Sequence, residues 1–237
     1  MKFENKLISG LFVKRYKRFF VDVTLRSKVV TAHCPNTGSM HGLLKKGNKV
    51  WLSKSNNPKR KLKYTLEIIE INGSKVGVNT HSTNKIVFDA LKSNFFKEFK
   101  KNCEIISEVK FGINTRFDFL IKNKNFKAFL EVKNVTLSRK LNLAEFPDAV
   151  TTRGLKHIKE LIKARNRGYE VFIAFIIQRE DCSKFRLASD IDYQYAKLLN
   201  KADLILGKKE TEKIIFNASN LKKLIKDLES VIYKHQL

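Results

Sequence analysis

The stretch RFDFLIKNKNFKAFLEVKN, residues 116–134, contains two apolar runs separated by a short polar segment. This pattern predicts two neighbouring strands joined by a turn. Asp118, Glu131 and Lys133 lie inside the runs, where a charge is costly unless it is paired, binds a metal or faces a cleft. The stretch therefore predicts a strand pair that carries a polar site.

Alternation along the strands would bring the three charged side chains together. Glu131 and Lys133 are two residues apart and share one face of their strand. If the two runs pair as neighbours, Asp118 lies beside Glu131. Two adjacent carboxylates repel each other unless a cation lies between them, and Mg²⁺ or Mn²⁺ with oxygen ligands would supply that cation.

The spacing D…ExK suits the hydrolysis of a phosphodiester, which needs charge neutralisation, a metal-activated water and a lysine near the phosphate. Asp118, Glu131 and Lys133 are the catalytic candidates, with Asp118 and Glu131 as metal ligands. Glu108, on the preceding strand, is a candidate third acid. The alternative is a structural ion pair between Lys133 and one of the acids at a sheet edge.

The residues around this stretch predict a mixed α/β sandwich. The expected order is helix 82–99 (with Ser82 or Thr83 near its N-cap), strands 103–111, 115–122 and 127–135, helix 150–168, strand 169–178, helix 191–201, strand 202–207 and helix 218–234. The first three strands should be antiparallel, because the links between them are too short for crossovers. The continuous apolar run 169–178 predicts a strand that is covered on both faces.

Residues 1–82 predict a separate, all-β domain. Short β-branched and aromatic runs are separated by turn residues, and the Asn72-Gly73 pair is a strong hairpin signal. The expected strands are 11–25, 28–34, 48–54, 63–73 and 74–80. Five short strands favour a small barrel of the OB type. The chain as a whole is then an α+β protein of two domains, 1–82 and 83–237.

The charge predicts a polyanionic partner. Lys plus Arg is 48 and Asp plus Glu is 23, a net charge of +25. A bias toward Lys, Asn and Ile codons could raise lysine everywhere, but the basic residues also cluster, at KRYKR (14–18) and PKRKLK (58–63). Both features favour nucleic-acid binding. The expected phosphate-contacting residues are Arg15, Lys17, Arg18, Lys59, Arg60 and Lys61, with Arg153 and His157 near a helix N-terminus.

Two aromatic residues near these clusters, Phe19 and Trp51, are expected in the core of the barrel. The segment AHCPNTGSM (32–40) predicts an interdomain loop, a phosphate-facing loop or merely a tight turn. The three cysteines form no CxxC pair, which argues against a structural zinc site. No signal peptide is visible, and the longest apolar run, 171–177, is too short to span a bilayer. We therefore expect a cytoplasmic protein with no membrane partner.

The sequence resembles the sugar fermentation stimulation protein family over nearly its whole length. The matching stretches are RYKRFFVDV, AHCPNTGSM, NPKRKLKYTLE, VGVNT, SEVKFG, RFDFLI, LEVKNVTL, FPDAVTTRGLKH and IIQRED. The resemblance implies an OB-type domain followed by a nuclease-like domain of the PD-(D/E)xK superfamily. It implies that the acidic motif falls on Asp118, Glu131 and Lys133, although Phe117 stands where that motif usually has proline.

Three functions remain open at this point. The first is a Mg²⁺-dependent nuclease that acts on single- or double-stranded DNA. The second, which the family's name favours, is a non-catalytic DNA-binding regulator of sugar-utilisation (maltose) genes on a nuclease-derived fold. The third is a protein directed to RNA, which an OB-like domain also permits.

Overall fold

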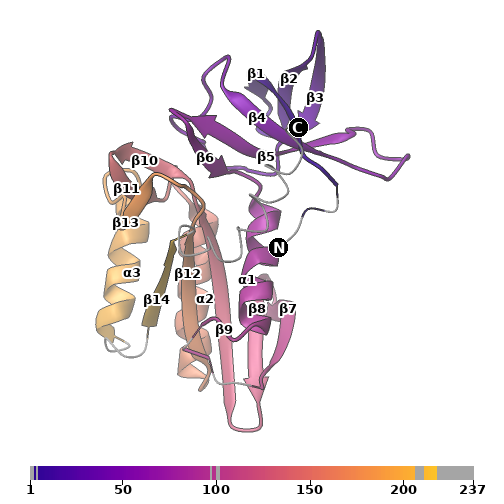
Figure 1. The fold of residues 1–237 in the computed structure, drawn as a ribbon. Coiled ribbons are helices and arrows are strands. Elements are labelled where there is room, and N and C mark those ends of the chain that lie inside the picture. Colours follow the sequence, from indigo (N-terminus) through magenta and orange to yellow (C-terminus); the bar gives the residue numbers. More distant parts are fainter. Residues whose placement is uncertain (1–2, 4, 97, 100–101, 206–210, 218–237) are drawn as a thin grey trace.

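The computed structural model describes residues 3, 5–96, 98–99, 102–205 and 211–217. They form a β-barrel followed by a mixed α/β domain, and the barrel lies over one end of the second domain's main sheet (Figure 1). The two-domain α+β organisation expected from the sequence is thus confirmed.

The barrel follows OB topology. Its sheet has the order β3-β2-β1-β4-β5-β6, and a parallel pairing of β3 with β5 closes the first five strands into a barrel. The strands are β1 (Ile8–Tyr16), β2 (Phe20–Leu25), β3 (Lys28–His33), β4 (Lys49–Lys54), β5 (Tyr64–Ile71) and β6 (Ser74–Gly77). β6 forms a hairpin with β5 through Asn72 and Gly73, which both have positive φ angles, as that turn signal predicts.

The sequence prediction of one strand over 11–25 was wrong. The run folds back on itself at residues 17–19 to give β1 and β2, which pair antiparallel from Tyr16 with Phe20. Lys17 and Arg18 have φ angles of 47° and 62°. These are left-handed conformations that usually belong to Gly or Asn, so basic residues gave no turn signal here.

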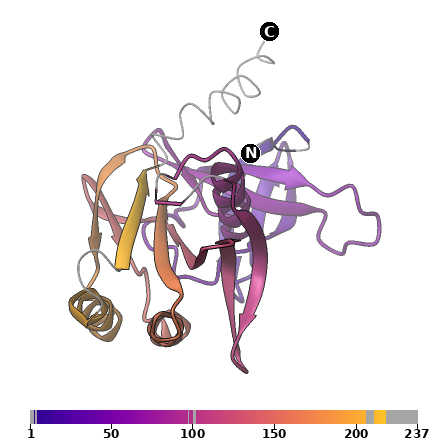
Figure 2. The same ribbon diagram turned by 90° about the horizontal axis from the view of Figure 1, so that it is seen from below.

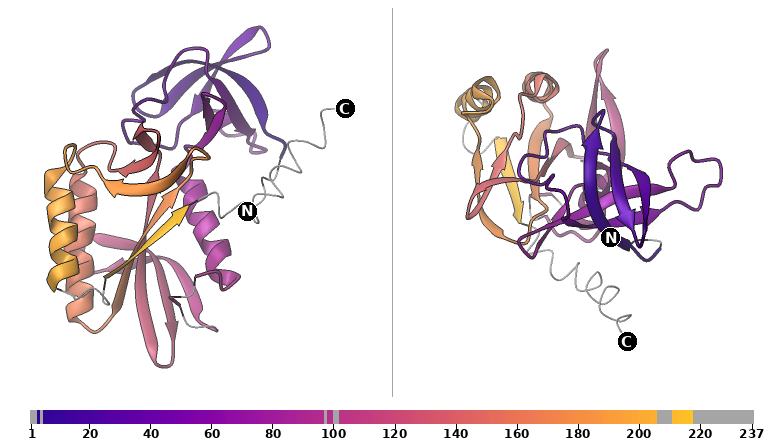
Figure 3. Two further views of the ribbon diagram at one scale, coloured as in Figure 1. Left: turned by 60° about the vertical axis from the view of Figure 1, so that its left-hand side comes forward. Right: turned by 90° about the horizontal axis from the view of Figure 1, so that it is seen from above.

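The α/β domain is built on a five-stranded sheet of order β14-β12-β9-β8-β7. β12 runs parallel to β9 and β14, whereas β7, β8 and β9 are antiparallel neighbours. Helix α1 covers one face, and α2 and α3 cover the other (Figures 2 and 3). The elements are α1 (Thr80–Lys92), β7 (Glu104–Phe111), β8 (Thr115–Asn123), β9 (Phe126–Val135), β10 (Leu137–Lys140), β11 (Asn142–Phe146), α2 (Thr152–Asn166), β12 (Glu170–Ile177), β13 (Cys182–Leu187), α3 (Tyr193–Ile205) and β14 (Thr211–Asn217).

β12 is buried on both faces, as its continuous apolar run predicted. Ile173 and Phe175 pack in the core on the α2 side of the sheet, and Phe172 and Ala174 pack in the core on the α1 side. The two cores hold the helices against the sheet, which keeps the strand ends in fixed positions.

Several helices and strands have bounds that differ from the predicted ones. α1 begins at Thr80 with Asn79 as its N-cap, not Ser82 or Thr83, and it ends at Lys92. Residues 202–205 complete α3 and form no strand, and the strand in that region is β14. The small sheet β10-β11-β13 was not predicted at all. The helix expected over 218–234 lies outside the described residues.

The barrel and the α/β domain are joined by backbone contacts. Gly77 N–H donates to the Gln178 carbonyl at 2.8 Å, and Val76 forms a bridge with Arg179 at the end of β12. The predicted boundary at residue 82 falls inside α1, whose start follows the last barrel strand closely. Among the described residues, no helix combines the length and apolar character needed to cross a bilayer.

Candidate active site

Asp118 lies where β8 and β9 separate. The two strands pair from Phe119 opposite Leu130 toward their hairpin, and the ladder stops at the next residue. There the Asp118 carboxylate takes the place of a backbone acceptor, receiving the Val132 N–H at 2.7 Å. Its other oxygen accepts from Asn84 Nδ2 at 2.8 Å, in the first turns of α1. The two strands pair as the sequence predicted, and the ladder ends just before Asp118 and Glu131.

Glu131 lies on the opposite strand and is 3% exposed. Its Oε1 accepts from Lys133 Nζ at 2.6 Å and also contacts His157 Nδ1, on α2. Its Oε2 has no hydrogen-bond partner among the residues that the structure describes. A buried carboxylate oxygen without a partner is costly, so this atom is available to an additional ligand.

The two carboxylates influence each other. Burial and the neighbouring charge of Glu131 raise the pKa of Asp118 to about 6. Burial also acts to raise the pKa of Glu131, but the Lys133 ammonium and His157 outweigh it, so that the pKa of Glu131 is lowered. The local charge balance is therefore incomplete at Asp118 and would be improved by a cation.

Asp118 and Glu131 form the acidic floor of a cleft of about 930 Å³ between the two domains. One wall comes from the barrel and includes Arg18, Phe19 and the loop 36–39, and the other comes from residues 147–153. The first turns of α1 complete the lining. A strand of nucleic acid lying in this cleft would contact both domains and the acidic floor at once.

Glu108, the predicted third acid, lies further out. It has a φ of 57° in β7 and forms an ion pair with Arg116 at 3.7 Å, with both side chains exposed. It lines the cleft but belongs to no metal-ligand cluster, since no group of three His, Cys, Asp or Glu side chains suited to a metal occurs in the described ranges.

The predicted phosphate-contacting residues divide into three groups. Arg15, Arg18 and Arg153 line the cleft. Lys17, Lys59, Arg60 and Lys61 lie outside its lining, on the β1–β2 turn (17–19) and the β4–β5 loop (55–63). His157 is buried behind the floor with its Nδ1 at Glu131, so the structure gives it a partner that the sequence did not predict.

Arg15 is held by backbone carbonyls. Its guanidinium donates to the carbonyls of Arg18 at 2.9 Å, Gly38 at 2.9 Å and Asn36 at 2.6 Å. The same loop contacts the α/β domain, because Met40 N–H donates to Asp148 Oδ2 at 2.9 Å. Arg15 therefore fixes the barrel wall of the cleft, and its predicted phosphate contact stays a prediction.

The loop 36–39 approaches the α/β domain most closely at Gly38. A Cβ there would lie 2.5 Å from Asp148 Oδ2, so the Asp148 carboxylate would have to move. Ser39 Oγ also donates to the Asp148 carbonyl, at 2.6 Å. Of the readings that the sequence left open for AHCPNTGSM, the interdomain loop is confirmed.

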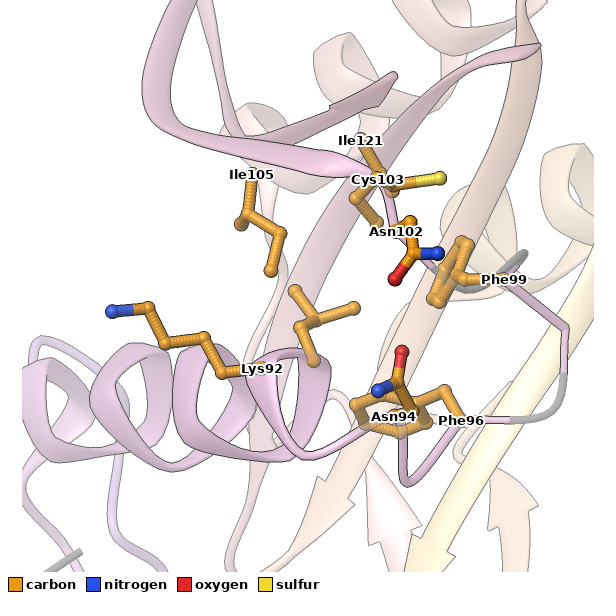
Figure 4. Close-up of a pocket in the computed structure, with 9 residues that line it drawn as sticks. Lys92, Asn94, Phe96, Phe99, Asn102, Cys103, Ile105 and Ile121 are labelled. Atoms are coloured by element: carbon orange, nitrogen blue, oxygen red, sulfur yellow. The ribbon is translucent and has the colours of Figure 1, made fainter. Parts of the chain in front are cut away.

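Sequence reasoning missed Asn84, which orients Asp118. Its position in the first turns of a helix was the available signal. Gln178 was a peripheral candidate from its place at the carboxyl end of the central strand, and its Nε2 donates to Thr83 Oγ1 at 2.8 Å and to Asn134 Oδ1 at 2.7 Å. A second hollow, at the far end of α1, is lined by nine residues that include no carboxylate (Figure 4). It therefore lacks the chemistry of the cleft.

The donor set suits a hard divalent cation. Asp118 and Glu131 supply carboxylate oxygens from adjacent strands, and Glu131 Oε2 lacks a partner among the described residues. Mg²⁺ takes one or two carboxylates and keeps several waters, so it needs no third acid from the protein. The residues present therefore fit such an ion.

Two family models match the chain. The sugar fermentation stimulation protein RE domain, a restriction-endonuclease-like domain, matches residues 81–204. The N-terminal OB domain of the same family matches residues 13–78. The two matched segments coincide with the α/β domain and the barrel.

Related proteins match over most of their length. The sugar fermentation stimulation protein homolog of Pelagibacter ubique is 55% identical over 195 residues, covering 82% of this chain and 84% of the relative. The homolog of Bdellovibrio bacteriovorus is 45% identical over 214 residues, covering 85% and 88%. A solved structure, that of Pyrococcus furiosus SfsA in complex with Ca²⁺, matches with a TM-score of 0.82 and 27% identity, covering 92% of this chain and 90% of that one.

Proposed function

The chain belongs to the sugar fermentation stimulation protein family, and we propose that it is a divalent-metal-dependent nuclease that binds DNA and cleaves it in the cleft between its two domains. The observation that carries this proposal is the pair of facing carboxylates, Asp118 and Glu131, with Glu131 Oε2 unpartnered in the described part of the chain. The complex of the Pyrococcus furiosus relative with Ca²⁺ supports a divalent-metal site in the family.

Asp118 and Glu131 would hold Mg²⁺ or Mn²⁺. When bound, the metal would neutralise charge on the scissile phosphate and lower the pKa of a bound water. Asn84 and the Val132 N–H hold the Asp118 carboxylate in a fixed orientation through one hydrogen bond to each oxygen. His157 and Lys133 fix one oxygen of Glu131 and leave the other available.

Lys133 has the position that the chemistry needs. Its ammonium lies 2.6 Å from Glu131 Oε1, and both residues line the cleft. A lysine there can donate a hydrogen bond to a nonbridging phosphate oxygen, stabilising the charge that grows in an in-line attack. Because it already contacts a metal-ligand candidate, it needs no large movement to reach a bound phosphate.

The positive surface supports DNA as the substrate. The net charge is +25, and the β1–β2 turn and β4–β5 loop, both rich in basic residues, are the loops through which OB barrels bind oligonucleotides. Arg18 continues this surface into the cleft, and Arg153, exposed in the first turn of α2, faces it from the other domain. Basic residues could thus contact successive phosphates of one bound strand, from the barrel to the acidic floor.

The test is cleavage of labelled single- and double-stranded DNA and RNA in Mg²⁺, Mn²⁺ or EDTA. Wild type is compared with Asp118→Ala and Lys133→Ala, and with Glu104→Gln as a control that removes an exposed acid at the start of β7. We expect metal-dependent cleavage of DNA that is lost by at least about 100-fold in the two site variants and kept in the control. Absence of wild-type cleavage with every metal would contradict the nuclease.

A non-catalytic DNA-binding protein is the second candidate. The observation in its favour is that Lys133 and His157 already contact Glu131 Oε1, and no cluster of three acidic or metal-binding side chains occurs in the described residues. On this reading, DNA binding is salt-sensitive but indifferent to EDTA and to Asp118→Ala. The cleavage assay and a binding assay in EDTA together separate the two functions.

A further inference from the structure

Phe19, expected in the barrel core, is instead 45% exposed at the tip of the β1–β2 turn. Its neighbour Arg18 is also exposed, and both line the interdomain cleft. A large aromatic ring on a polar, basic loop gains nothing from the barrel core. Its position above an acidic floor suggests that it contacts a ligand.

The turn that carries Phe19 is held in place. The Phe19 carbonyl accepts from Cys34 N–H at 2.8 Å, and the Arg18 carbonyl accepts from Arg15 Nε at 2.9 Å. Phe19 N–H donates to the Lys17 carbonyl at 2.8 Å within the turn. The ring is therefore presented by a backbone that is fixed on both sides, which lowers the entropy cost of binding to it.

Basic side chains share the cleft with the ring. Arg15, Arg18 and Arg153 line it, together with His33. His81 is exposed in the first turn of α1. An aromatic face with cations beside it matches a nucleotide, whose base stacks while its phosphate pairs with the charges.

We propose that Phe19 stacks on an unpaired base, and that the cleft therefore accepts a single-stranded segment of nucleic acid. This inference rests on the proposed function, since it assumes that the cleft holds nucleic acid. Inside a duplex both faces of each base are covered by its neighbours, so Phe19 has no face to stack on away from the duplex ends unless a base is unstacked. The cleft volume of about 930 Å³ is that of a site that encloses a short ligand.

The test is equilibrium binding in EDTA, where no cleavage occurs. The probes are a labelled oligothymidylate of about 12 nucleotides and its duplex with oligoadenylate. Phe19→Ala removes the ring and Phe19→Trp keeps an aromatic face. Tyr193→Ala is the matched control, because Tyr193 is an aromatic residue that is 65% exposed on α3 and outside the cleft lining.

We expect Phe19→Ala to weaken single-strand binding about 5- to 150-fold and duplex binding much less. Phe19→Trp and Tyr193→Ala should bind the single strand as wild type does. Equal losses on both probes, no loss in Phe19→Ala, or a loss in Phe19→Trp as large as that in Phe19→Ala would overturn the inference. Cleavage plays no part in this readout, so the nuclease and the stacking role can fail separately.

Discussion

Glu131 and Glu145 are two buried glutamates of the α/β domain with opposite surroundings. Glu145, on β11, is fully buried, and both of its oxygens accept hydrogen bonds from Arg139, at 2.8 Å each. Arg186 adds a third at 2.8 Å. These bonds, that of Arg139 foremost, lower the pKa of Glu145 to about 2. Glu131 has its two side-chain partners, Lys133 and His157, on one oxygen, and its other oxygen has none among the described residues.

The difference separates a structural carboxylate from one that can take a ligand. At Glu145 the arginines compensate the loss of water at both oxygens, and the group ties β10, β11 and β13 together. At Glu131 the compensation is partial, and the facing Asp118 adds a like charge. Burial alone therefore does not identify the functional acid, whereas incomplete pairing does.

The largest effects are expected when the two glutamates are changed in the same way. Glu131→Gln should weaken Mn²⁺ or Ca²⁺ binding by at least about 100-fold, because it removes a ligand charge. Glu145→Gln should leave metal binding intact but lower Tm by about 5–10 °C, because two arginines lose a buried partner. Isothermal titration with the metal alone and thermal unfolding in EDTA measure the two effects.

Two outcomes would contradict the roles assigned to Glu131 and Glu145. Loss of metal binding in folded Glu145→Gln would mean that the Arg139 cluster shapes the site. Unchanged metal binding in Glu131→Gln would remove Glu131 from the ligand set.

A smaller effect is expected at His157, which touches Glu131 from behind. His157→Leu keeps the apolar packing of α2 but removes the contact with Glu131 Oε1, so the carboxylate loses part of its orientation. We expect metal affinity to fall about 10- to 100-fold. His157→Asn, which can place an amide nitrogen near the position of Nδ1, should recover most of it.

This pair of variants separates orientation from packing. If His157→Leu and His157→Asn lose the same affinity, the hydrogen bond is not what matters. If neither loses affinity, His157 only fills space behind the sheet.

The spacing of apolar residues predicted most of the fold, because the side chains that build the cores recur at the regular intervals of strands and helices. The strands around Asp118 and Glu131, and the buried run of β12, have patterns that only a covered sheet explains. The turn at residues 17–19 escaped prediction because Lys17 and Arg18 adopt left-handed conformations that their side chains do not favour. Consequently Phe19 was assigned to the core when it belongs to the cleft.

The candidate site was predictable only in its charged residues. The D…ExK spacing named Asp118, Glu131 and Lys133, since alternation alone places Glu131 and Lys133 on one face. It could not show that the ladder breaks at Asp118, or that His157 reaches Glu131 from a helix, because these depend on tertiary packing. Which acids remain incompletely paired also depends on distances that no spacing pattern contains.

The smallest expected effect is on the pH dependence of folding stability, for which Asp118 and Glu145 should act in opposite directions. Its pKa is raised from 3.8 to about 6 by burial and by Glu131, so the folded protein binds this proton more tightly than the unfolded chain does. The resulting stabilisation is fully present below about pH 4 and is lost as the pH rises through about 6, amounting to at most about 3 kcal/mol. Glu145 has the opposite sign, since its contribution is fully present above pH 4.5 and is lost as the pH falls through about 2.

Asp118→Asn removes this titration while an amide can still accept from Val132 N–H. In EDTA, we expect Asp118→Asn to exceed wild type in Tm by several degrees at pH 8 and to lose most of that advantage by pH 4.5, as measured by thermal unfolding. The same difference at both pH values would mean that the Asp118 carboxylate is not strained in the metal-free protein. If added Mn²⁺ removes the Tm difference between Asp118→Asn and wild type at pH 8, the ion binds the Asp118 carboxylate and offsets its unfavourable surroundings. The reason is that the ion stabilises only the carboxylate form.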